Sequence, residues 1–155
     1  MTESTLPPAL EEILETFDWL ETWEERYGYI IELGETLPGL PIEEQTKENK
    51  VNGCLSSVWL VAHADADDPS RMILSADSDS AIVKGLVAIV LAIFSGHTAE
   101  EIVGIEVSET FVTLGLSQHL SVSRRNGLSA MVKRIRQLAT MHAASAHRCE
   151  SFSTN

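Results

Sequence analysis

The chain has 155 residues, which favours a single domain, and 44% of them are hydrophobic, enough for a packed core at this size. Its 23 acidic and 11 basic residues give a formal net charge of −12. Because so negative a surface repels phosphate groups, we expect no nucleic acid and no anionic membrane as partner. The expected partner is another protein, which docks through local charge complementarity.

The N-terminal sequence has no basic segment followed by an apolar one, so it predicts no targeting signal. The most apolar stretch, residues 86–94, falls short of the roughly 20 residues that a membrane span needs. We therefore expect a cytoplasmic protein whose two cysteines, Cys54 and Cys149, are reduced and do not pair with each other.

Two helices are expected near the N-terminus. Apolar residues recur at helical spacing over residues 10–17. Thr22 and Glu25 form a capping-box pattern, so a second helix should begin there and end at Gly34 or at the Pro-Gly segment that follows. The polar residues 47–52 are compatible with a short strand.

A β-hairpin and a long helix are predicted in the middle of the chain. The β-branched and aromatic residues 58–62 favour a strand buried on both faces, and residues 72–76 follow a turn, so the two strands should pair antiparallel. Residues 77–80, DSDS, predict a helix N-terminus. The helix over about residues 79–94 is apolar nearly all round, which predicts the central core helix, and Gly96 should end it.

Three further helices complete the prediction. Thr98 and Glu101 form another capping box at the start of a short helix, and residues 108–116 favour a second short helix. The last helix carries its apolar face over residues 128–139.

The order of elements predicts an α+β fold, in which a small antiparallel β-sheet packs against several α-helices on one side. No internal repeat and no second domain are evident. We expect one domain over residues 1–155, with a frayed N-terminus at residues 1–6 and a frayed C-terminal tail at residues 147–155.

Cys54 lies in the segment NGCLSS, just before the predicted buried strand. Gly53 permits a turn there, so the cysteine is expected on a loop. Free cysteines usually pack in cores, whereas loops often carry function. The placement alone leaves two interpretations open, a small hydrophobe that fills a gap and a functional thiol.

Four separated segments resemble the SufE family of sulfur-acceptor proteins, which serve cysteine desulfurases in iron–sulfur cluster assembly. The segments are WEERYGYIIELG at 23–34, VNGCLSSVW at 51–59, DSDSAIVKG at 77–85, and QHL with SRRNGL at 118–128. The resemblance extends in register over about residues 23–138. Leu55 and Ser57 depart from the polar residues that many members carry in the cysteine loop.

The resemblance implies an α+β fold similar to that of the scaffold proteins of cluster assembly. It also implies that Cys54 accepts a sulfane sulfur from the persulfide of a cysteine desulfurase, by thiol exchange. The chain would then be no enzyme itself. It would stimulate a pyridoxal-phosphate desulfurase and pass sulfur to an iron–sulfur scaffold complex, with no cofactor and no metal of its own.

Four residues are expected to support Cys54. Gly53 and Ser56 lie in its loop. Asp79 is expected first as a helix-capping carboxylate and second as an anchor of that loop. The resemblance places Arg124 beside the loop or at the desulfurase interface; the alternative is a solvated arginine that precedes a cap at Asn126.

Two other functions remain alternatives, a non-catalytic regulator of the desulfurase and a scaffold that binds a metal or cluster directly. A scaffold usually needs several thiolate or imidazole ligands. His142 and His147 are five residues apart, about 140° around a helix, so they do not converge with Cys149 on a metal. Cys149 lies in the polar tail and is expected to be dispensable.

Cys54 is expected to be partly or largely shielded in the isolated protein. A persulfide exposed to cellular thiols would be reduced quickly, so a sulfur carrier benefits from hiding its sulfur until the partner binds. Shielding should also raise the pKa of the thiol.

Overall fold

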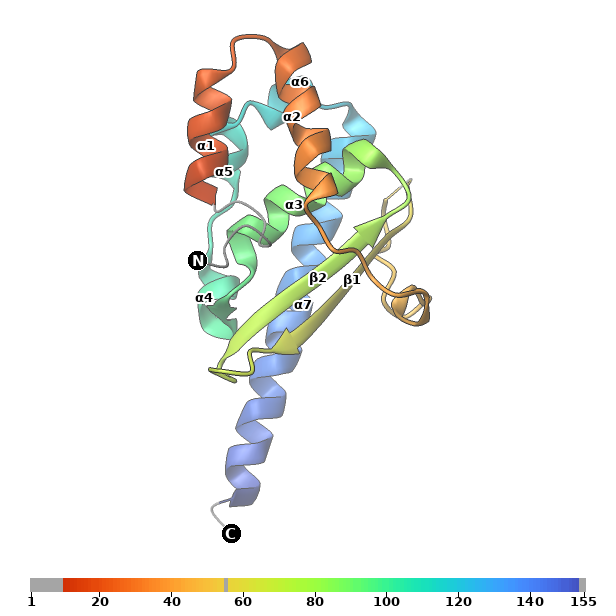
Figure 1. The fold of residues 1–155 in the computed structure, drawn as a ribbon. Coiled ribbons are helices and arrows are strands. Elements are labelled where there is room, and N and C mark those ends of the chain that lie inside the picture. The colour runs from red at the N-terminus through yellow and green to blue at the C-terminus, as the bar shows by residue number, and fades with distance from the viewer. Residues whose placement is uncertain (1–9, 55, 154–155) are drawn as a thin grey trace.

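A computed structural model describes the backbone of residues 10–54 and 56–153, and the side chains of these residues up to Ala144. It confirms the α+β prediction, with a three-stranded sheet and helices that pack against it (Figure 1). The elements in chain order are α1 (Leu10–Trp19), α2 (Trp23–Glu35), the 3-10 helix η2 (Ile42–Glu44), β1 (Val58–Ala64), β2 (Arg71–Ser78), α3 (Ala81–Phe94), β3 (His97–Thr98), α4 (Ala99–Gly104), α5 (Ser108–Thr113), α6 (Leu116–His119) and α7 (Val122–Ser153).

The predicted hairpin is confirmed. Strands β1 and β2 pair antiparallel, with Val58 opposite Ser78 and Ala64 opposite Met72. The short strand β3 pairs with the start of β2 and was not predicted, because two residues are too few for an alternating pattern. The expected strand over residues 47–52 is wrong, since Lys50 forms only an isolated bridge to Trp59.

One face of the sheet packs against the helices. Met72, Leu74 and Ala76 of β2 are buried, whereas the alternate residues are at least partly exposed. In Figure 1, α7 passes behind the hairpin and α3 runs beside β2. The prediction that β1 is buried on both faces is confirmed at Val61 but is wrong at Trp59, on the same face, which is only partly buried.

Helix α3 is the predicted core helix, with ten buried residues among its fourteen. It crosses α2 so closely that the crossing point holds glycine on both helices. A Cβ on Gly85 would lie 1.9 Å from the carbonyl oxygen of Ile30, and a Cβ on Gly34 would lie 2.7 Å from the Gly85 nitrogen. The contact between α2 and α3 therefore requires the absence of side chains at these two positions.

The two predicted capping boxes are confirmed. The Glu25 N–H donates to Thr22 Oγ1 at 3.1 Å, and the Thr22 N–H donates to Glu25 Oε1 at 3.1 Å. The same reciprocal bonds join Thr98 and Glu101 at the start of α4.

The C-terminal half corrects two predictions. The stretch expected as one helix over residues 108–116 is split into α5 and α6, because Gly115 adopts a left-handed conformation with φ +75°. Helix α7 spans Val122–Ser153 and begins earlier than an Asn126 cap would place it. The frayed tail expected at residues 147–155 stays a prediction. Residues 1–6, the other segment expected to fray, lie outside the described residues.

Candidate functional site

The loop that carries Cys54 is held against α7. Gly53 has a left-handed φ of +97°, and a Cβ added there would lie 3.2 Å from the Cβ of Ala130 on α7. A side chain at this position would be both strained and crowded. Gly53 therefore lets the backbone turn tightly against the helix immediately before the cysteine.

A second contact anchors the loop after the cysteine, at the junction between β2 and α3. The Ser57 N–H donates to Asp79 Oδ1 at 3.1 Å, and the Asp79 N–H donates to the Ser57 carbonyl oxygen at 3.3 Å. The Ser78 hydroxyl donates to the same carbonyl at 2.8 Å. Three hydrogen bonds thus hold one residue of the loop in register with β2.

These contacts correct the first expectation for Asp79. The helix cap is Ser80, whose hydroxyl accepts a hydrogen bond from the Val83 N–H at 3.4 Å. Asp79 lies one residue before the cap, so its carboxylate reaches the loop and not the free N–H groups of α3. The contact is the one that the second expectation requires, and the role of Asp79 as an anchor of the Cys54 loop stays a prediction.

Replacing Asp79 by Ala should loosen the loop. The Ser57 N–H would lose its acceptor, so we expect Cys54 to react severalfold faster with iodoacetamide and the free energy of unfolding to fall by about 1 kcal/mol. Asp79→Asn is the matched control, because it removes the same charge but keeps an acceptor oxygen. An alkylation rate that rises equally in both variants would show that charge, and not the hydrogen bond, controls access to Cys54.

The Cys54 thiol is half-buried and free, as its expected shielding requires, and it donates to the carbonyl oxygen of Gly127 on α7 at 3.7 Å. It opens into a cavity of about 250 Å³ between the loop, α3 and the first turns of α7. The lining is apolar on one side and bears hydroxyls and one cation on the other. It consists of Cys54, Ser56, Val83, Leu86, Ser121, Ser123, Arg124, Gly127 and Met131.

Burial raises the pKa of the Cys54 thiol above its ordinary value, because the surrounding protein solvates a thiolate less well than water does. The resting group is therefore a neutral thiol at neutral pH. Arg124 lines the cavity from the first turn of α7, where a cation opposes the helix dipole. No carboxylate in the described part of the chain forms an ion pair with it.

The structure therefore brings Cys54, Ser56 and Arg124 to one cavity. Gly53 packs against α7 before the cysteine, and Asp79 accepts a hydrogen bond from the loop after it. The alternative for Arg124 is wrong only in the position of the cap, since the Arg124 N–H donates at 3.3 Å to Oγ of Ser121, the residue that precedes α7. The arginine itself is exposed, as that alternative expected. Sequence reasoning missed Gly127 as a partner of the thiol. Its one signal was a glycine inside a helix, where it costs about 1 kcal/mol relative to alanine.

No group of three or more His, Cys, Asp or Glu residues with the arrangement of a metal site occurs within the part of the chain that the structure describes. The His142 Nε2 atom lies 3.3 Å from the carbonyl oxygen of Pro69. The side chains of His147 and Cys149 lie outside the described residues. Among the described residues, no helix is long and apolar enough to cross a membrane.

Comparison with known families gives a match to SufE, described as an Fe-S metabolism associated domain, over residues 11–139. The chain belongs to the SufE family. The family match begins before the first motif and ends close to where the resemblance of the sequence ended, so it includes the whole hairpin, the Cys54 loop and the start of α7.

Two SufE-like relatives are similar over most of their length. An uncharacterized SufE-like protein of Rhizobium etli is 51% identical over 138 residues, which cover 88% of this chain and 93% of the relative. One of Rhizobium meliloti is 51% identical over 133 residues, covering 84% and 94%. The solution structure of a hypothetical protein from Thermus thermophilus shares the fold, with a TM-score of 0.70, 19% identity, and coverage of 89% and 98%.

Proposed function

We propose that this SufE-family chain is a sulfur carrier that takes persulfide sulfur from a cysteine desulfurase onto Cys54, stimulates that enzyme by clearing its persulfide, and passes the sulfur to an iron–sulfur scaffold complex. The single observation that supports this most is the placement of Cys54. Its half-buried thiol opens into a cavity with free volume beside the sulfur atom. A bound sulfur would be sheltered there from other thiols.

The transfer is an exchange at divalent sulfur. The Cys54 thiolate attacks the outer sulfur of the desulfurase persulfide, a new sulfur–sulfur bond forms on Cys54, and the bond to the desulfurase cysteine breaks. The desulfurase sulfur leaves as a thiolate, so the step needs no external oxidant or reductant. A reduced Cys54 is required, which places the protein in a reducing compartment, in keeping with the cytoplasm.

The raised pKa of Cys54 makes the resting thiol a poor nucleophile, because only the thiolate attacks. The desulfurase complex would then have to expose the loop and stabilise the thiolate. Arg124 is the cation on this cavity, so it is the residue we assign to that stabilisation. Such a requirement confines the reaction to the correct complex.

Mass spectrometry after mixing the protein with a cysteine desulfurase and cysteine tests the proposal. We expect a mass increase of about 32 Da for each sulfur, located on the peptide that contains Cys54 and reversed by a reductant. Stimulation of the desulfurase without any mass increase would instead identify a non-catalytic regulator. Iron or a cluster bound to the protein in place of sulfur would identify a scaffold.

Replacing Gly127 by Ala should slow sulfur uptake by Cys54 without lowering the stability of the fold. The added methyl would lie 3.6 Å from the Cys54 sulfur with no other neighbour within 4 Å, so the fold should tolerate it and gain up to about 1 kcal/mol from helix propensity. The methyl occupies space beside the sulfur, so persulfide formation should slow by roughly tenfold. Gly28→Ala, in α2, is the control, because a Cβ there meets nothing within 4 Å. Equal uptake rates in the two variants would show that the space at Gly127 is not used.

A further inference from the structure

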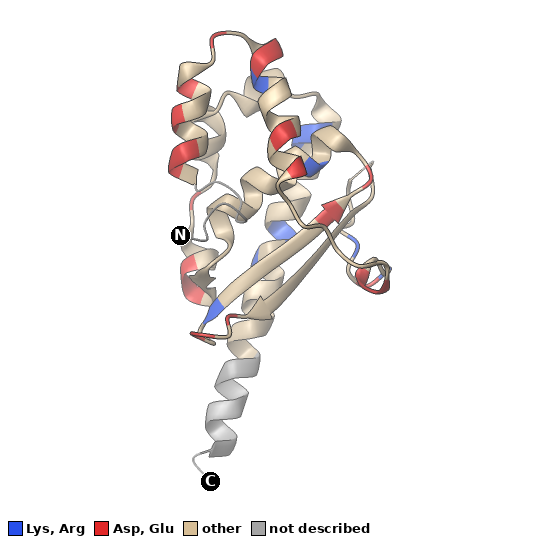
Figure 2. Ribbon diagram, viewed as in Figure 1, with Lys and Arg blue, Asp and Glu red and all other residues tan. Residues whose placement is uncertain are grey.

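The charges of this acidic chain are distributed unevenly. Residues 10–35 contain nine acidic residues and one basic residue, whereas α7 contains six of the chain's 11 Lys and Arg residues and a single acidic one. Figure 2 shows red segments gathered on α1 and α2, and blue without red on the described part of α7. Helix α7 is therefore basic although the net charge of the chain is −12.

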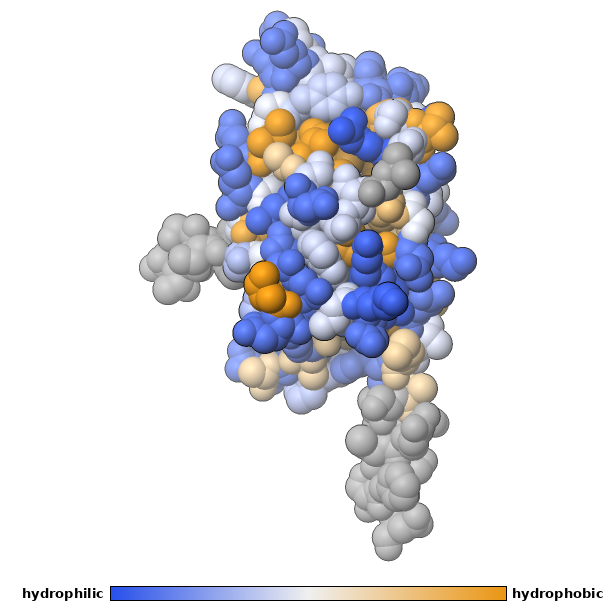
Figure 3. Space-filling view, turned by 90° about the vertical axis from the view of Figure 1, so that its right-hand side faces the viewer, coloured by the Kyte–Doolittle hydropathy of each residue, from blue (hydrophilic) through white to orange (hydrophobic). Residues whose placement is uncertain are grey.

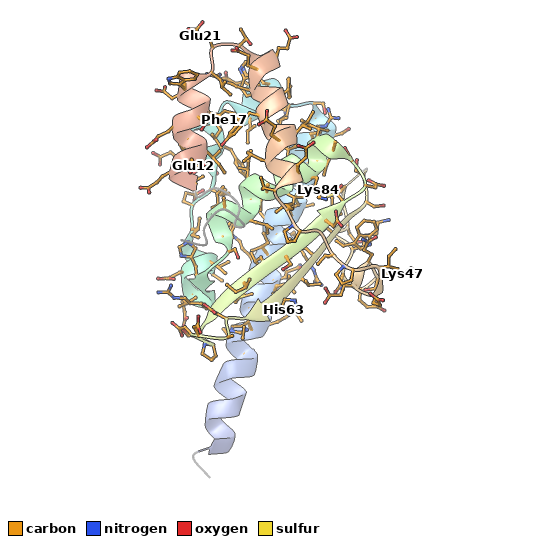
Figure 4. All side chains as sticks on the ribbon, viewed as in Figure 1. Glu12, Phe17, Glu21, Lys47, His63 and Lys84 are labelled. Carbon is orange, nitrogen blue, oxygen red and sulfur yellow. The ribbon has the colours of Figure 1, made fainter. Side chains whose placement is uncertain are left out.

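Two cations of α7 and two from another segment line a groove next to the Cys54 loop. The groove has a volume of about 720 Å³ and lies between the segment that precedes the loop and the middle of α7. Lys47 and Lys50 line it from the segment, Lys133 and Arg134 line it from α7, and Glu48 is its one carboxylate. We call this surface the basic groove. Figure 4 shows Lys47 on the side of the molecule away from Glu12 and Glu21.

The cations of the basic groove lack carboxylate partners within the described residues. Within the described residues the three ion pairs are Arg71–Asp68, Lys84–Asp77 and His97–Glu101, so none of the four cations is neutralised by a carboxylate. The Arg134 Nη2 atom donates to the carbonyl oxygen of Glu48 at 3.3 Å, but its Nε atom is buried without a hydrogen-bond partner in the described structure. Four cations that line one groove without a carboxylate partner favour an external anionic ligand.

The basic groove touches the loop at residues that do not line the sulfur cavity. Asn52 and Gly53 belong to its lining, while Cys54 belongs to the lining of the sulfur cavity. Ala130 of α7, against which Gly53 packs, also lines the groove. A ligand in the groove would therefore contact the residue that precedes Cys54 and leave the thiol free for exchange.

The charge pattern favours an acidic peptide segment over a nucleic acid as the ligand of the groove. A nucleic acid extends past any one groove and would meet the surrounding acidic surface, whereas a short peptide segment contacts only the cations. Figure 3, which faces the side that lies to the right in Figure 1, shows strongly hydrophilic residues with separate apolar patches, so the surface is suited to polar contacts. Arginine and lysine pair well with carboxylates, and arginine does so through two parallel hydrogen bonds.

We propose that the basic groove binds a carboxylate-rich segment of the protein that exchanges sulfur with Cys54. The inference rests on the proposed function for the identity of that protein and adds the chemistry by which it is recognised. Contact with Lys50, Lys133 and Arg134 orients the partner beside Gly53, at the start of the loop that must move. Docking and exposure of the sulfur thus involve the same short stretch of chain.

The test separates docking from sulfur chemistry by charge reversal. Lys50→Glu and Lys133→Glu each reverse one exposed cation of the groove, from different segments. Arg71→Glu is the matched control, because it makes the same charge change at the end of the hairpin far from the loop. We expect either groove variant to raise the concentration needed for half-maximal stimulation of a desulfurase by about tenfold, with the maximal rate retained and the effect reduced by salt. Arg71→Glu should change the half-maximal concentration less than twofold, and Lys133→Arg should leave that concentration unchanged.

Binding of a fluorescent hexaglutamate peptide, measured by fluorescence anisotropy, tests whether the groove binds carboxylates independently of sulfur transfer. The expected result is binding to the full chain that either groove variant weakens and Arg71→Glu does not. Persulfide on Cys54 together with equal behaviour of all three reversals would overturn the inference and leave the sulfur carrier standing. Absence of persulfide would overturn the proposed carrier function. The peptide-binding measurement alone would then test the proposal for the groove. Tighter binding of inorganic phosphate or of an oligothymidine than of the peptide would also overturn it.

Discussion

Replacing Cys54 by Ser should abolish the sulfur uptake and desulfurase stimulation that we propose, while the protein stays folded. A hydroxyl has nearly the shape of a thiol and can still donate to the Gly127 carbonyl, so the free energy of unfolding should change by no more than about 1 kcal/mol. It cannot hold a sulfane sulfur. The measurement is the mass increase on the protein, beside the rate of the desulfurase with and without the variant.

Cys149→Ser is the control for this experiment, because it removes the other thiol and should leave uptake and stimulation unchanged. Loss of uptake in the control would point to a relay between the two thiols. Full stimulation by the Cys54→Ser protein would show that the desulfurase is activated by binding alone, and the carrier function would be wrong.

Replacing Gly85 by Ala should destabilise the protein strongly, although it adds only one methyl group. The added Cβ would lie 1.9 Å from the Ile30 carbonyl oxygen and 2.6 Å from its carbon, and backbone atoms of a packed helix cannot move away cheaply. We expect a loss of about 3 kcal/mol or more in the free energy of unfolding, measured by urea denaturation.

Gly28→Ala provides the comparison within the same pair of helices. Gly28 lies in α2 without positive φ, and a Cβ there meets nothing within 4 Å, so helix propensity should stabilise this variant by roughly 0.5–1 kcal/mol. If Gly85→Ala were as stable as Gly28→Ala, the two helices could not cross as closely as the structure has them.

Local patterns in the sequence were enough for several features. The capping boxes at Thr22 and Thr98 depend on residues three positions apart, and both form as predicted. The hairpin follows from two β-prone segments joined by a turn, and the apolar run of α3 identifies the core helix. Cys54 stood out because its loop and four family motifs occur in order along the chain, and membership of the SufE family is confirmed.

The failures have a common cause. Asp79 was expected to cap a helix because capping depends on neighbouring residues, but its carboxylate binds Ser57, 22 positions earlier. The start of α7 and the division between α5 and α6 were misplaced, because Ser121 and Gly115 give only weak local signals. Where several local patterns compete, packing against the rest of the chain decides between them.

The sequence by itself determined the fold class, the position of the candidate thiol and the charge of the molecule, because each depends on composition or on residues close together in the chain. Only the tertiary structure decided what surrounds Cys54. Its sulfur binds Gly127, 73 residues away, and the basic groove joins residues from before the loop to the middle of α7. Contacts over such separations arise from the way helices pack on the sheet, and no spacing along the chain encodes them.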